Sequence, residues 1–477
     1  MNRAIIILSL LSFVFIYQSC QNQEQPDSDK TAEAHVFAEA EKIYESVCAG
    51  CHGLEVAAFA DRKEWKFGDS KDSIIYVISN GLAEEGMPAF DSTYSADQIN
   101  QLADYIIDAK ENVEKYRNAD PIESDTFQSE LLTYRIDTVI SGLNSPWGMD
   151  FLPGGELLVT DKSGELYMVG SDGNKTEISG VPDVLYEGQG GLMDVELHPN
   201  FEQNNFLYLS YSIYKEEDGE TLGSTAVARG VLDGNKLSSV EVVFEALPYF
   251  ATKHHYGSRL SFGTDGKLFI TAGERGKRDE NPQSLERDGG KVHRINDDGT
   301  IPSDNPFVEK EGAKASIYSY GHRNPQGLTI HPVTGEVWEH EHGPRGGDEI
   351  NIIEKGNNYG WRTISYGINY DGSTFTDKTE MEGMTQPIHY WVPSIAPSGM
   401  DFVTGDKYPE WKGNLLVGSL KYKYLDRVEI DGHTIVHEEP LIKGLGRVRS
   451  VRMGPDGYIY VGLERPGFVV KLVPVEE

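Results

Sequence analysis

The sequence predicts an all-β six-bladed β-propeller preceded by a small all-α domain. Two observations carry this prediction. From about Ser141 to the C-terminus, a short apolar strand, a turn with Asp, Gly or Pro, and a second apolar strand recur. Before that region, apolar residues recur at helical spacing instead. The 477 residues are too many for one compact domain, so two folded units are expected.

The first residues have the pattern of a bacterial export signal. A basic start at Arg3 is followed by an apolar run, 4–16, which is too short to span a bilayer comfortably. The run ends before Ser19 and Cys20, which resemble a lipoprotein processing site where Cys20 becomes lipidated. A simple cleaved signal is the alternative. We therefore expect a protein exported to the bacterial cell envelope, facing the periplasm and attached to the membrane through a lipid anchor.

The motif Cys48-Ala49-Gly50-Cys51-His52 has the spacing used for covalent attachment of a c-type haem. Two thiols on one helical turn reach the two haem vinyl groups, and the adjacent His52 ligates the iron. Half of a zinc site and a redox cysteine pair are the alternatives. A zinc site would need further Cys or His ligands, and the following residues supply no second pair.

Met87 is the expected sixth ligand of the haem iron. A lone Met is more often a core residue, but here Pro88 follows it in a loop and a haem motif precedes it. A further helix is expected from Ser95, with Gln98 as a capping-box partner. Residues 35–110 therefore resemble a small all-α class I cytochrome c domain.

The second region is a repeat of strand, turn and strand. Its copies begin near Trp147, Gly191, Ser258, Gln326, Ser398 and Val448. Repeats of this kind are typical of a β-propeller sequence, and six copies predict six blades. A solenoid or a β-sandwich would also repeat strands, and these are the alternatives.

Polar residues gather just before the repeated strands. In a propeller, the residues that enter each innermost strand lie around one end of the central channel. The residues concerned are Gln189, His254, His255, Arg323, Asn324, Gln326, Ser394, Arg447 and Arg449. Any one of them could be an ordinary polar loop residue. Their occurrence in several blades predicts one polar, cationic site at the channel mouth.

Several segments identify the second region with a known family. They are Gly188–Leu192, Lys253–Leu260, Gly273–Gly276, Tyr320–Gly327, Glu341–Asn351, Ser394–Met400 and Arg447–Arg449. Over residues 138–472 the chain resembles the aldose sugar dehydrogenases that depend on pyrroloquinoline quinone (PQQ). The soluble PQQ glucose dehydrogenases are more distant relatives of the same fold.

The resemblance implies roles for three residues in catalysis. His255 resembles the general base that removes the proton of the sugar's anomeric hydroxyl, with His254 as the alternative base. Arg323 resembles the donor that stabilises negative charge on the quinone oxygen, and Gln189 helps to position base and substrate. His342 and Glu274 depart from the soluble glucose dehydrogenases and indicate the broader aldose branch.

The resemblance also implies cofactor and metal contacts. The PQQ contacts are Gln189, Arg323, Asn324, Gln326, Ser394, Lys421, Arg447 and Arg449. Cations suit a cofactor with three carboxylates, although Lys421 by itself could be a solvated surface lysine. The carbonyls of Gly343 and Pro344 are implied for a calcium ion beside PQQ. Glu349 and the carbonyl of Tyr359 resemble a second calcium site.

The sequence thus leads to a functional expectation. The protein should oxidise an aldose at its anomeric carbon to the lactone with PQQ and calcium. Electrons should then pass to the fused haem and to an envelope acceptor, a cytochrome or the quinone pool. Three alternatives stay open: a PQQ enzyme for another sugar-derived aldehyde such as sorbosone, a non-catalytic propeller that binds carbohydrate or protein, and a haem electron carrier. A net charge of −33 without a basic stripe argues against nucleic acid.

The expected organisation has five segments. They are a lipoprotein signal peptide (1–19), a flexible tether (20–34), the cytochrome c domain (35–110), a linker (111–134) and the propeller domain (135–477).

Overall fold

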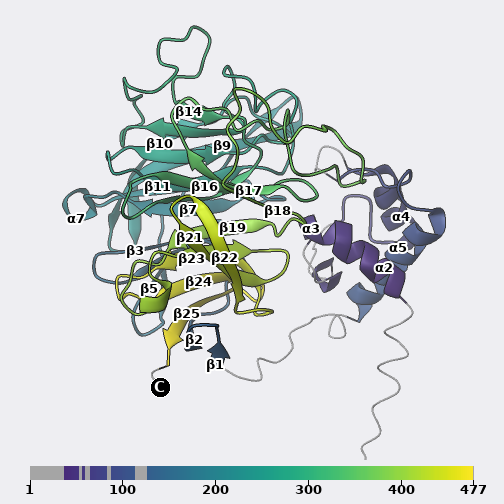
Figure 1. Cartoon of the computed structure of the whole chain (residues 1–477), viewed down its shortest axis with the longest axis horizontal. Coiled ribbons are helices and arrows are strands. Elements are labelled where there is room, and N and C mark those ends of the chain that lie inside the picture. Colours follow the sequence, from purple (N-terminus) through teal and green to yellow (C-terminus); the bar gives the residue numbers. More distant parts are fainter. Residues whose placement is uncertain (1–36, 53–55, 60–64, 83–86, 113–125, 476–477) are drawn as a thin grey trace, which may run out of the picture. The chain divides into compact units, whose positions relative to one another are not determined.

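The computed structural model describes most of the chain (Figure 1). The described residues are 37–52, 56–59, 65–82, 87–112 and 126–475. The predicted signal peptide and tether lie outside them. Among the described residues, no helix combines the length and the apolar character needed to cross a membrane.

The first part of the described chain is helical. Its elements are α2 (Ala38–Ile43), the π-helical turn η1 (Tyr44–Cys48), α3 (Ala49–His52), the 3-10 turn η2 (Val56–Phe59), α4 (Lys71–Asn80) and α5 (Ala96–Glu111). Ser95 and Gln98 form the predicted capping box at the start of α5: Ser95 Oγ accepts the Gln98 N–H at 3.3 Å, and Gln98 Oε1 accepts the Ser95 N–H at 2.9 Å.

Helix α4 was not predicted from the sequence. Ser70 caps it by accepting the Ser73 N–H, and Ile74 and Ile78 form its buried face. The signals were therefore present: a capping serine and two apolar residues at helical spacing.

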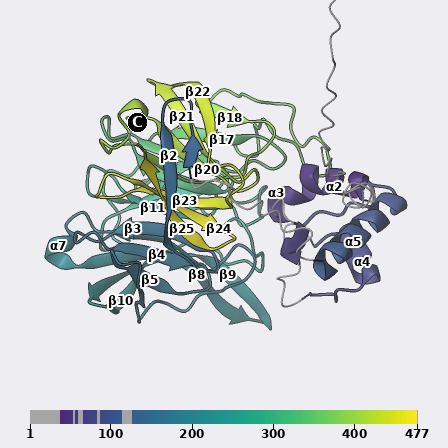
Figure 2. The ribbon, with the colours of Figure 1, turned by 90° about the horizontal axis from the view of Figure 1, so that it is seen from below.

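The rest of the described chain forms six antiparallel sheets, arranged as blades (Figures 1 and 2). The first blade contains β3 (Pro146–Phe151), β4 (Leu157–Asp161), β5 (Leu166–Val169) and β6 (Lys175–Glu177). The second contains β7 (Leu192–Leu197), β8 (Phe206–Glu217), β9 (Glu220–Asp233) and β10 (Lys236–Glu245), with the short helix α7 (Phe201–Asn204) before β8. The third contains β11 (Gly257–Phe262), β12 (Leu268–Ala272), β13 (Lys291–Ile295) and β14 (Ile317–Tyr320).

The remaining blades follow the same order. The fourth contains β15 (Pro325–Ile330), β16 (Val337–Glu341), β17 (Asp348–Ile353) and β18 (His389–Trp391). The fifth contains β19 (Pro397–Phe402), β20 (Leu415–Ser419), β21 (Tyr424–Asp431) and β22 (Thr434–Leu441), with the 3-10 turn η4 (Pro409–Trp411) before β20. The sixth contains β23 (Arg447–Met453), β24 (Ile459–Glu464), β25 (Phe468–Pro474), β2 (Thr133–Ile140) and β1 (Thr126–Gln128).

The innermost strands are β3, β7, β11, β15, β19 and β23, and each begins within one or two residues of a predicted repeat. Each inner strand contacts the next around the ring, and β23 contacts β3. The ring is therefore closed, and the prediction of a six-bladed propeller is confirmed.

The N-terminal strands complete the last blade. β2 pairs antiparallel with β25, so that Ile136 lies opposite Leu472, and β1 adds to the outer edge of β2. Closure in this way gives β25 a partner, because an unpaired strand would leave a row of free N–H and C=O groups. The predicted linker 111–134 therefore extends too far: residues 126–134 belong to the blade by strand pairing.

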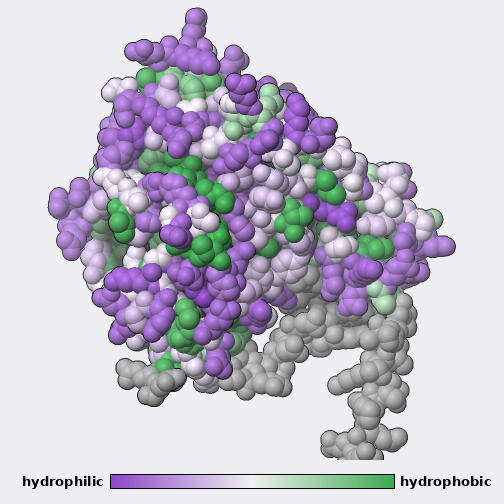
Figure 3. Space-filling view, in the orientation of Figure 1, coloured by the Kyte–Doolittle hydropathy of each residue, from purple (hydrophilic) through white to green (hydrophobic). Residues whose placement is uncertain are grey.

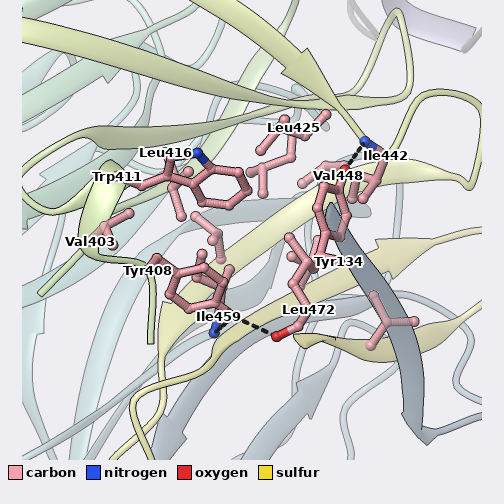
Figure 4. Packing of buried hydrophobic residues seen from close by; sticks show 14 of the residues in the cluster. Tyr134, Val403, Tyr408, Trp411, Leu416, Leu425, Ile442, Val448, Ile459 and Leu472 are labelled. Atoms are coloured by element: carbon pink, nitrogen blue, oxygen red, sulfur yellow. Dashed lines mark hydrogen bonds between the residues drawn. The ribbon is translucent and has the colours of Figure 1, made fainter. Parts of the chain in front are cut away.

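A buried cluster joins this closing blade to the fifth one (Figure 4). Tyr134 of β2 is 1% exposed, lies edge-on to Trp411 at 5.9 Å between ring centroids, and its hydroxyl accepts the Ile442 N–H at 3.2 Å. Nearby, the Tyr408 hydroxyl donates to the Leu472 carbonyl. The aromatic residues thus satisfy polar groups within an otherwise apolar interface.

The surface contrasts with these interfaces between blades. In the view of Figure 3 it is mainly hydrophilic, with separate hydrophobic patches. The net charge of −33 is consistent with a highly solvated exterior.

Replacing Tyr134 by alanine should destabilise the propeller by about 3–5 kcal/mol, because the change opens a cavity in the closing interface. Tyr134→Phe should cost about 1 kcal/mol, since only the hydrogen bond to Ile442 is lost. Denaturant unfolding would measure both. Tyr214→Ala, at a 43% exposed position, is the matched control and should change little. Equal stability of Tyr134→Ala and wild type would contradict this account of closure.

Candidate functional site

The predicted haem motif lies on consecutive helical turns. Cys48 ends η1 and is half-buried, and α3 carries both Cys51 and His52. The His52 ring lies 5.0 Å from the ring of the buried Phe59, measured between centroids. The spacing of the two cysteines and the histidine on one helical segment, with the His52 ring beside an aromatic residue, fits covalent haem attachment.

Met87 lies after α4 and pairs with Leu82. Leu82 and Met87 exchange backbone hydrogen bonds of 2.8 and 3.0 Å. Gly81 has a φ of +70°, and a Cβ there would lie 2.6 Å from the Met87 carbonyl oxygen, so this close approach requires glycine. These contacts hold the backbone at Met87, the predicted sixth ligand of the haem iron.

His255 lies just before β11 in a backbone conformation that is unusual for a residue with a side chain. Its φ is +56°. The Gln189 side chain accepts the His255 N–H at 2.8 Å, and the His255 carbonyl accepts the Arg275 N–H at 3.3 Å. Gly273 packs against the same carbonyl, where a Cβ would approach to 2.2 Å. Contacts from two blades thus hold His255 in this conformation.

In the described contacts, only the Nδ1 nitrogen of the His255 imidazole has a partner. Its Nδ1 lies 2.6 Å from Oε1 of the buried Glu274, and its side chain is 13% exposed. Burial, together with the charges of Arg323 and Arg275, holds the pKa of His255 well below its usual range. The ring is therefore neutral at pH 7, and an Nδ1–H donated to Glu274 leaves Nε2 as the basic nitrogen.

Arg323 lies before β15 and is 6% exposed. Its Nη1 donates to the carbonyls of His342 at 3.0 Å and Gly343 at 2.7 Å, and its backbone N–H donates to the Glu341 carboxylate. The Arg323 carbonyl accepts the Glu274 N–H at 2.8 Å, so the arginine and the partner of His255 are directly connected.

The next two residues tie blades together. Asn324 Oδ1 accepts the Gly257 N–H at 3.1 Å, and Gln326 Nε2 donates to the Gly257 carbonyl at 3.0 Å. Gln326 Oε1 in turn accepts Nη1 of Arg449 at 3.0 Å. These contacts link the third, fourth and sixth blades around the channel.

Arg447 and Arg449 of β23 share one carboxylate. Glu464 Oε2 accepts Arg447 Nε and Arg449 Nη2, each at 3.1 Å. The two guanidiniums lower the pKa of Glu464 well below its usual range, despite its burial. Arg449 Nε is buried and has no hydrogen-bond partner among the described residues, so it remains able to donate to a bound acceptor.

Ser394 is held by Asp348, which also binds the backbone of Gly343. The fully buried Asp348 carboxylate accepts the Ser394 hydroxyl at 2.7 Å and the N–H groups of Ile395 and Ala396 at 2.8 and 2.9 Å. It also accepts the Gly343 N–H at 2.8 Å. Burial raises its pKa to about 6.

Lys421 is 7% exposed and is not a solvated surface lysine. Its N–H donates to the Ile395 carbonyl at 3.2 Å. Burial lowers the pKa of its ammonium, while the charge of Asp348 acts in the opposite direction. It is therefore a desolvated cation beside the Ser394 loop.

One small, partly open pocket joins several of the predicted site residues. About 230 Å³ of space not filled by atoms lies within it, and part of this space is open to solvent. The lining residues are Arg323, Glu341, His342, Gly343, Gly347, Glu349, Tyr359, Trp361, Ile364 and Ser365. The structure thus brings Arg323 together with the predicted metal-binding residues Gly343, Glu349 and Tyr359.

Comparison with known proteins assigns the two parts of the chain. Residues 143–471 match the family described as Glucose / Sorbosone dehydrogenase. The chain belongs to this family. Residues 35–106 match the family described as Cytochrome C oxidase, cbb3-type, subunit III, so a cytochrome c domain precedes the propeller. Both predictions made from the sequence motifs are confirmed.

Individual relatives support the assignment. Over 350 residues the chain is 42% identical to Aldose sugar dehydrogenase YliI of Escherichia coli (strain K12), covering 72% of this chain and 93% of the relative. The apo-form structure of soluble Aldose sugar dehydrogenase from Escherichia coli has a TM-score of 0.68 and 40% identity, over 72% of this chain and 100% of that one. The PQQ-bound Aldose Sugar Dehydrogenase from Streptomyces coelicolor has a TM-score of 0.59 and 27% identity, over 72% and 98%.

The family resemblance predicts that the Gly343 carbonyl binds calcium. In the structure this oxygen already accepts a hydrogen bond from Arg323. Because Arg323 Nη1 donates to it at 2.7 Å, a cation on this oxygen would lie beside the guanidinium. Like charges at this distance repel. Binding of calcium at Gly343 and Pro344 would therefore require Arg323 to turn away from the carbonyl.

The surroundings of Glu349 fit a hard cation better. Glu349 lies opposite Glu341, and Glu339 lies opposite Asn351, on one side of the β16–β17 pair. Ligand atoms of His322, Glu339 and Glu341 lie within 4.8 Å of one another. Glu339 Oε1 and Asn351 Oδ1 are buried without a hydrogen-bond partner among the described residues. Buried, unpaired oxygens of this kind suit Ca²⁺.

Three residues that organise the site were given no role from the sequence. Glu274 was noted only as a departure from relatives, Asp348 only as part of a motif, and Glu464 not at all. The register of β23 and β24 places Arg447 opposite Glu464, which would have been the signal. Asp348 had no such local signal, because three of its four donors, in Ser394, Ile395 and Ala396, lie 46–48 residues away.

Replacing Asp348 by asparagine should destabilise the fold by about 2–4 kcal/mol, since an amide presents one acceptor oxygen to four donors. Denaturant unfolding at pH 7 would measure it. Asp406→Asn, at an exposed ion pair with Lys412, is the control and should be nearly neutral. Wild-type stability of Asp348→Asn would show that Asp348 does not hold the Gly343 and Ser394 segments together.

Proposed function

We propose that this protein oxidises an aldose at its anomeric carbon to the lactone, using PQQ and calcium. The electrons then pass to the fused c-type haem and on to an acceptor in the cell envelope. Membership of the glucose/sorbosone dehydrogenase family supports sugar oxidation with PQQ. The observation that carries the proposal is the neutral, strained His255, paired with Glu274 and connected to Arg323.

His255 acts as the general base. Its Nε2 accepts the proton of the anomeric hydroxyl, because the Nδ1–H is held by the Glu274 carboxylate. The positive charge that develops on the imidazole is stabilised by that carboxylate. Gln189 keeps the base in place by accepting the His255 N–H.

Arg323 supplies a positive charge, opposite to the negative charge that develops on the cofactor. Bound PQQ would supply the acceptor for the hydride of the anomeric carbon, and a calcium ion would polarise its carbonyl group. Arg323 donates hydrogen bonds to the oxygen on which negative charge develops. This role requires its guanidinium to leave the carbonyls of His342 and Gly343, on which it rests in the structure.

The remaining site residues hold the cofactor. Lys421, Arg447 and Arg449 provide three cations for the carboxylates of PQQ, and the unpartnered Nε of Arg449 fits this assignment. The polar contacts are assigned to Asn324, Gln326 and Ser394. Calcium is assigned to the carbonyls of Gly343 and Pro344, and a second calcium ion to Glu349 and Tyr359.

The cytochrome c domain supports the proposed path of electrons. A haem held by Cys48, Cys51, His52 and Met87 accepts one electron at a time. The family match of residues 35–106 supports this cofactor. Export and a lipid anchor at Cys20 would place the enzyme beside an envelope acceptor.

A second substrate class stays open, because the family description also names sorbosone. A sugar-derived ketoaldehyde would use the same base and the same hydride acceptor. A substrate panel separates the two.

Reconstitution tests the proposal. The apoprotein is incubated with PQQ and Ca²⁺, and dye reduction is measured with aldoses and with sorbosone. We expect turnover with aldoses, and none when Ca²⁺ is replaced by a chelator. Turnover with sorbosone alone would favour the second substrate class. No turnover with any sugar, despite bound PQQ, would contradict the proposal.

His255→Ala is the decisive variant, with His433→Ala, at a 58% exposed side chain, as the control. His255→Ala should lower kcat by at least about a hundredfold while the absorbance of bound PQQ is retained. In the wild type, turnover should not change with pH around 6.5, the usual pKa of histidine, and should fall only at lower pH. A midpoint near 6.5 would contradict a base with a depressed pKa.

Electron transfer within the chain makes a separate prediction. Stopped-flow spectra of the holoenzyme mixed with an aldose should show haem reduction following substrate oxidation, at a rate independent of protein concentration. Met87→Ala should slow or abolish the haem signal, because loss of a thioether ligand lowers the haem potential. A haem that stays oxidised during turnover would refute intramolecular transfer.

A further inference from the structure

Arg275 lies after β12 as a buried cation. It is 2% exposed and forms no ion pair with a carboxylate among the described residues. Its guanidinium donates instead to backbone carbonyls: Nη1 to His254, and Nη2 to Thr252 at 2.5 Å and to Gly223 at 3.3 Å. Burying a cation is costly even though the charge of Glu274 acts on it, so these carbonyls must compensate for lost water.

The backbone of Arg275 is tied to the same segment. Its N–H donates to the His255 carbonyl at 3.3 Å, and its carbonyl accepts the Thr252 hydroxyl at 2.7 Å. The guanidinium carbon lies 3.4 Å from the centroid of the Tyr256 ring. Arg275 thus contacts the chain on both sides of His255.

These contacts surround His255, whose backbone conformation is strained. His255 has a φ of +56°, which a residue with a Cβ adopts only when its surroundings hold it there. The carbonyls of Thr252 and His254 belong to the Thr252–Lys253 and His254–His255 peptide units, and the second of these leads directly into His255. Through Gly223, the guanidinium also anchors this segment to β9 of the neighbouring blade.

We propose that Arg275 is a positioning residue for His255: by binding the carbonyls of Gly223, Thr252 and His254, it fixes the direction of the imidazole toward the substrate. The inference rests on the proposed function, in which His255 is the general base. Arg275 itself touches neither substrate nor cofactor.

The charge of Arg275 adds a second effect. The groups that face His255 are Glu274 after β12, Arg323 before β15, His254, Gln189 and Arg275 itself. Arg275 and Arg323 both disfavour the imidazolium, and burial acts in the same direction. Removing the guanidinium charge should therefore raise the pKa of His255.

Two variants separate geometry from charge. Arg275→Lys keeps the charge but lacks the planar fork that now divides the three carbonyls between Nη1 and Nη2, so it changes the geometry of these contacts. Arg275→Met removes both. Arg287→Met is the matched control, since Arg287 is 37% exposed and pairs with an exposed glutamate.

We expect both Arg275 variants of the reconstituted full chain to lower kcat by about a hundredfold, as a misplaced catalytic group does. KM for the aldose and Kd for PQQ should stay within about twofold, because neither ligand is contacted. Only Arg275→Met should move the acid limb of the pH profile to higher pH. Arg287→Met should match the wild type.

A second measurement does not depend on turnover. Nuclear magnetic resonance of the histidine rings in the apoprotein, with His255 assigned through His255→Asn, should show a displaced resonance in both variants and a raised pKa in Arg275→Met. If the wild type oxidises no sugar, the proposed function fails while this measurement still decides the role of Arg275. An unchanged His255 resonance and pKa in both variants, or kcat losses matched by equal losses of PQQ affinity, would overturn the inference.

Discussion

The structure depends on the pairing of β2 with β25, which joins the beginning and the end of the propeller in one sheet. Without it, β25 would be an edge strand and the ring of inner strands would have no reason to close. Closure also places the sixth blade beside the first. Gln189, His255, Arg323 and Arg449 come from different blades, and hydrogen bonds between neighbouring segments connect them.

The channel mouth is built from buried charge rather than from apolar packing. Glu464 pairs with two arginines, Asp348 accepts from four donors, and Arg275 is solvated by backbone carbonyls. Each group has been removed from water, so each needs a fixed set of partners. Arg323 is the member whose present partners, the carbonyls of His342 and Gly343, a bound ligand would have to replace.

The same principle applies to His255. Burial and the charges of Arg323 and Arg275 hold its pKa well below its usual range, so the ring is neutral at pH 7. Because Glu274 pairs with Nδ1, Nε2 remains available. The strained backbone at this residue is supported by Gln189, Gly273 and Arg275, which come from two different blades. Local strain at His255 is therefore balanced by long-range contacts.

The sequence alone determined the haem motif, the six inner strands and the polar residues that precede them, because each is a local pattern with a fixed spacing or period. Through segments that resemble a family, it also led to His255 and Arg323 as candidate site residues. Tertiary structure alone decided which residues support them. Asp348 accepts from residues 394–396, which lie 46–48 positions along the chain, and Glu464 meets its arginines through the register of β23 and β24. Arg275 acts through carbonyls, which carry no side-chain signal. The extension of the last blade to Thr126 was likewise decided by pairing, since an edge strand gains its conformation from the strand beside it.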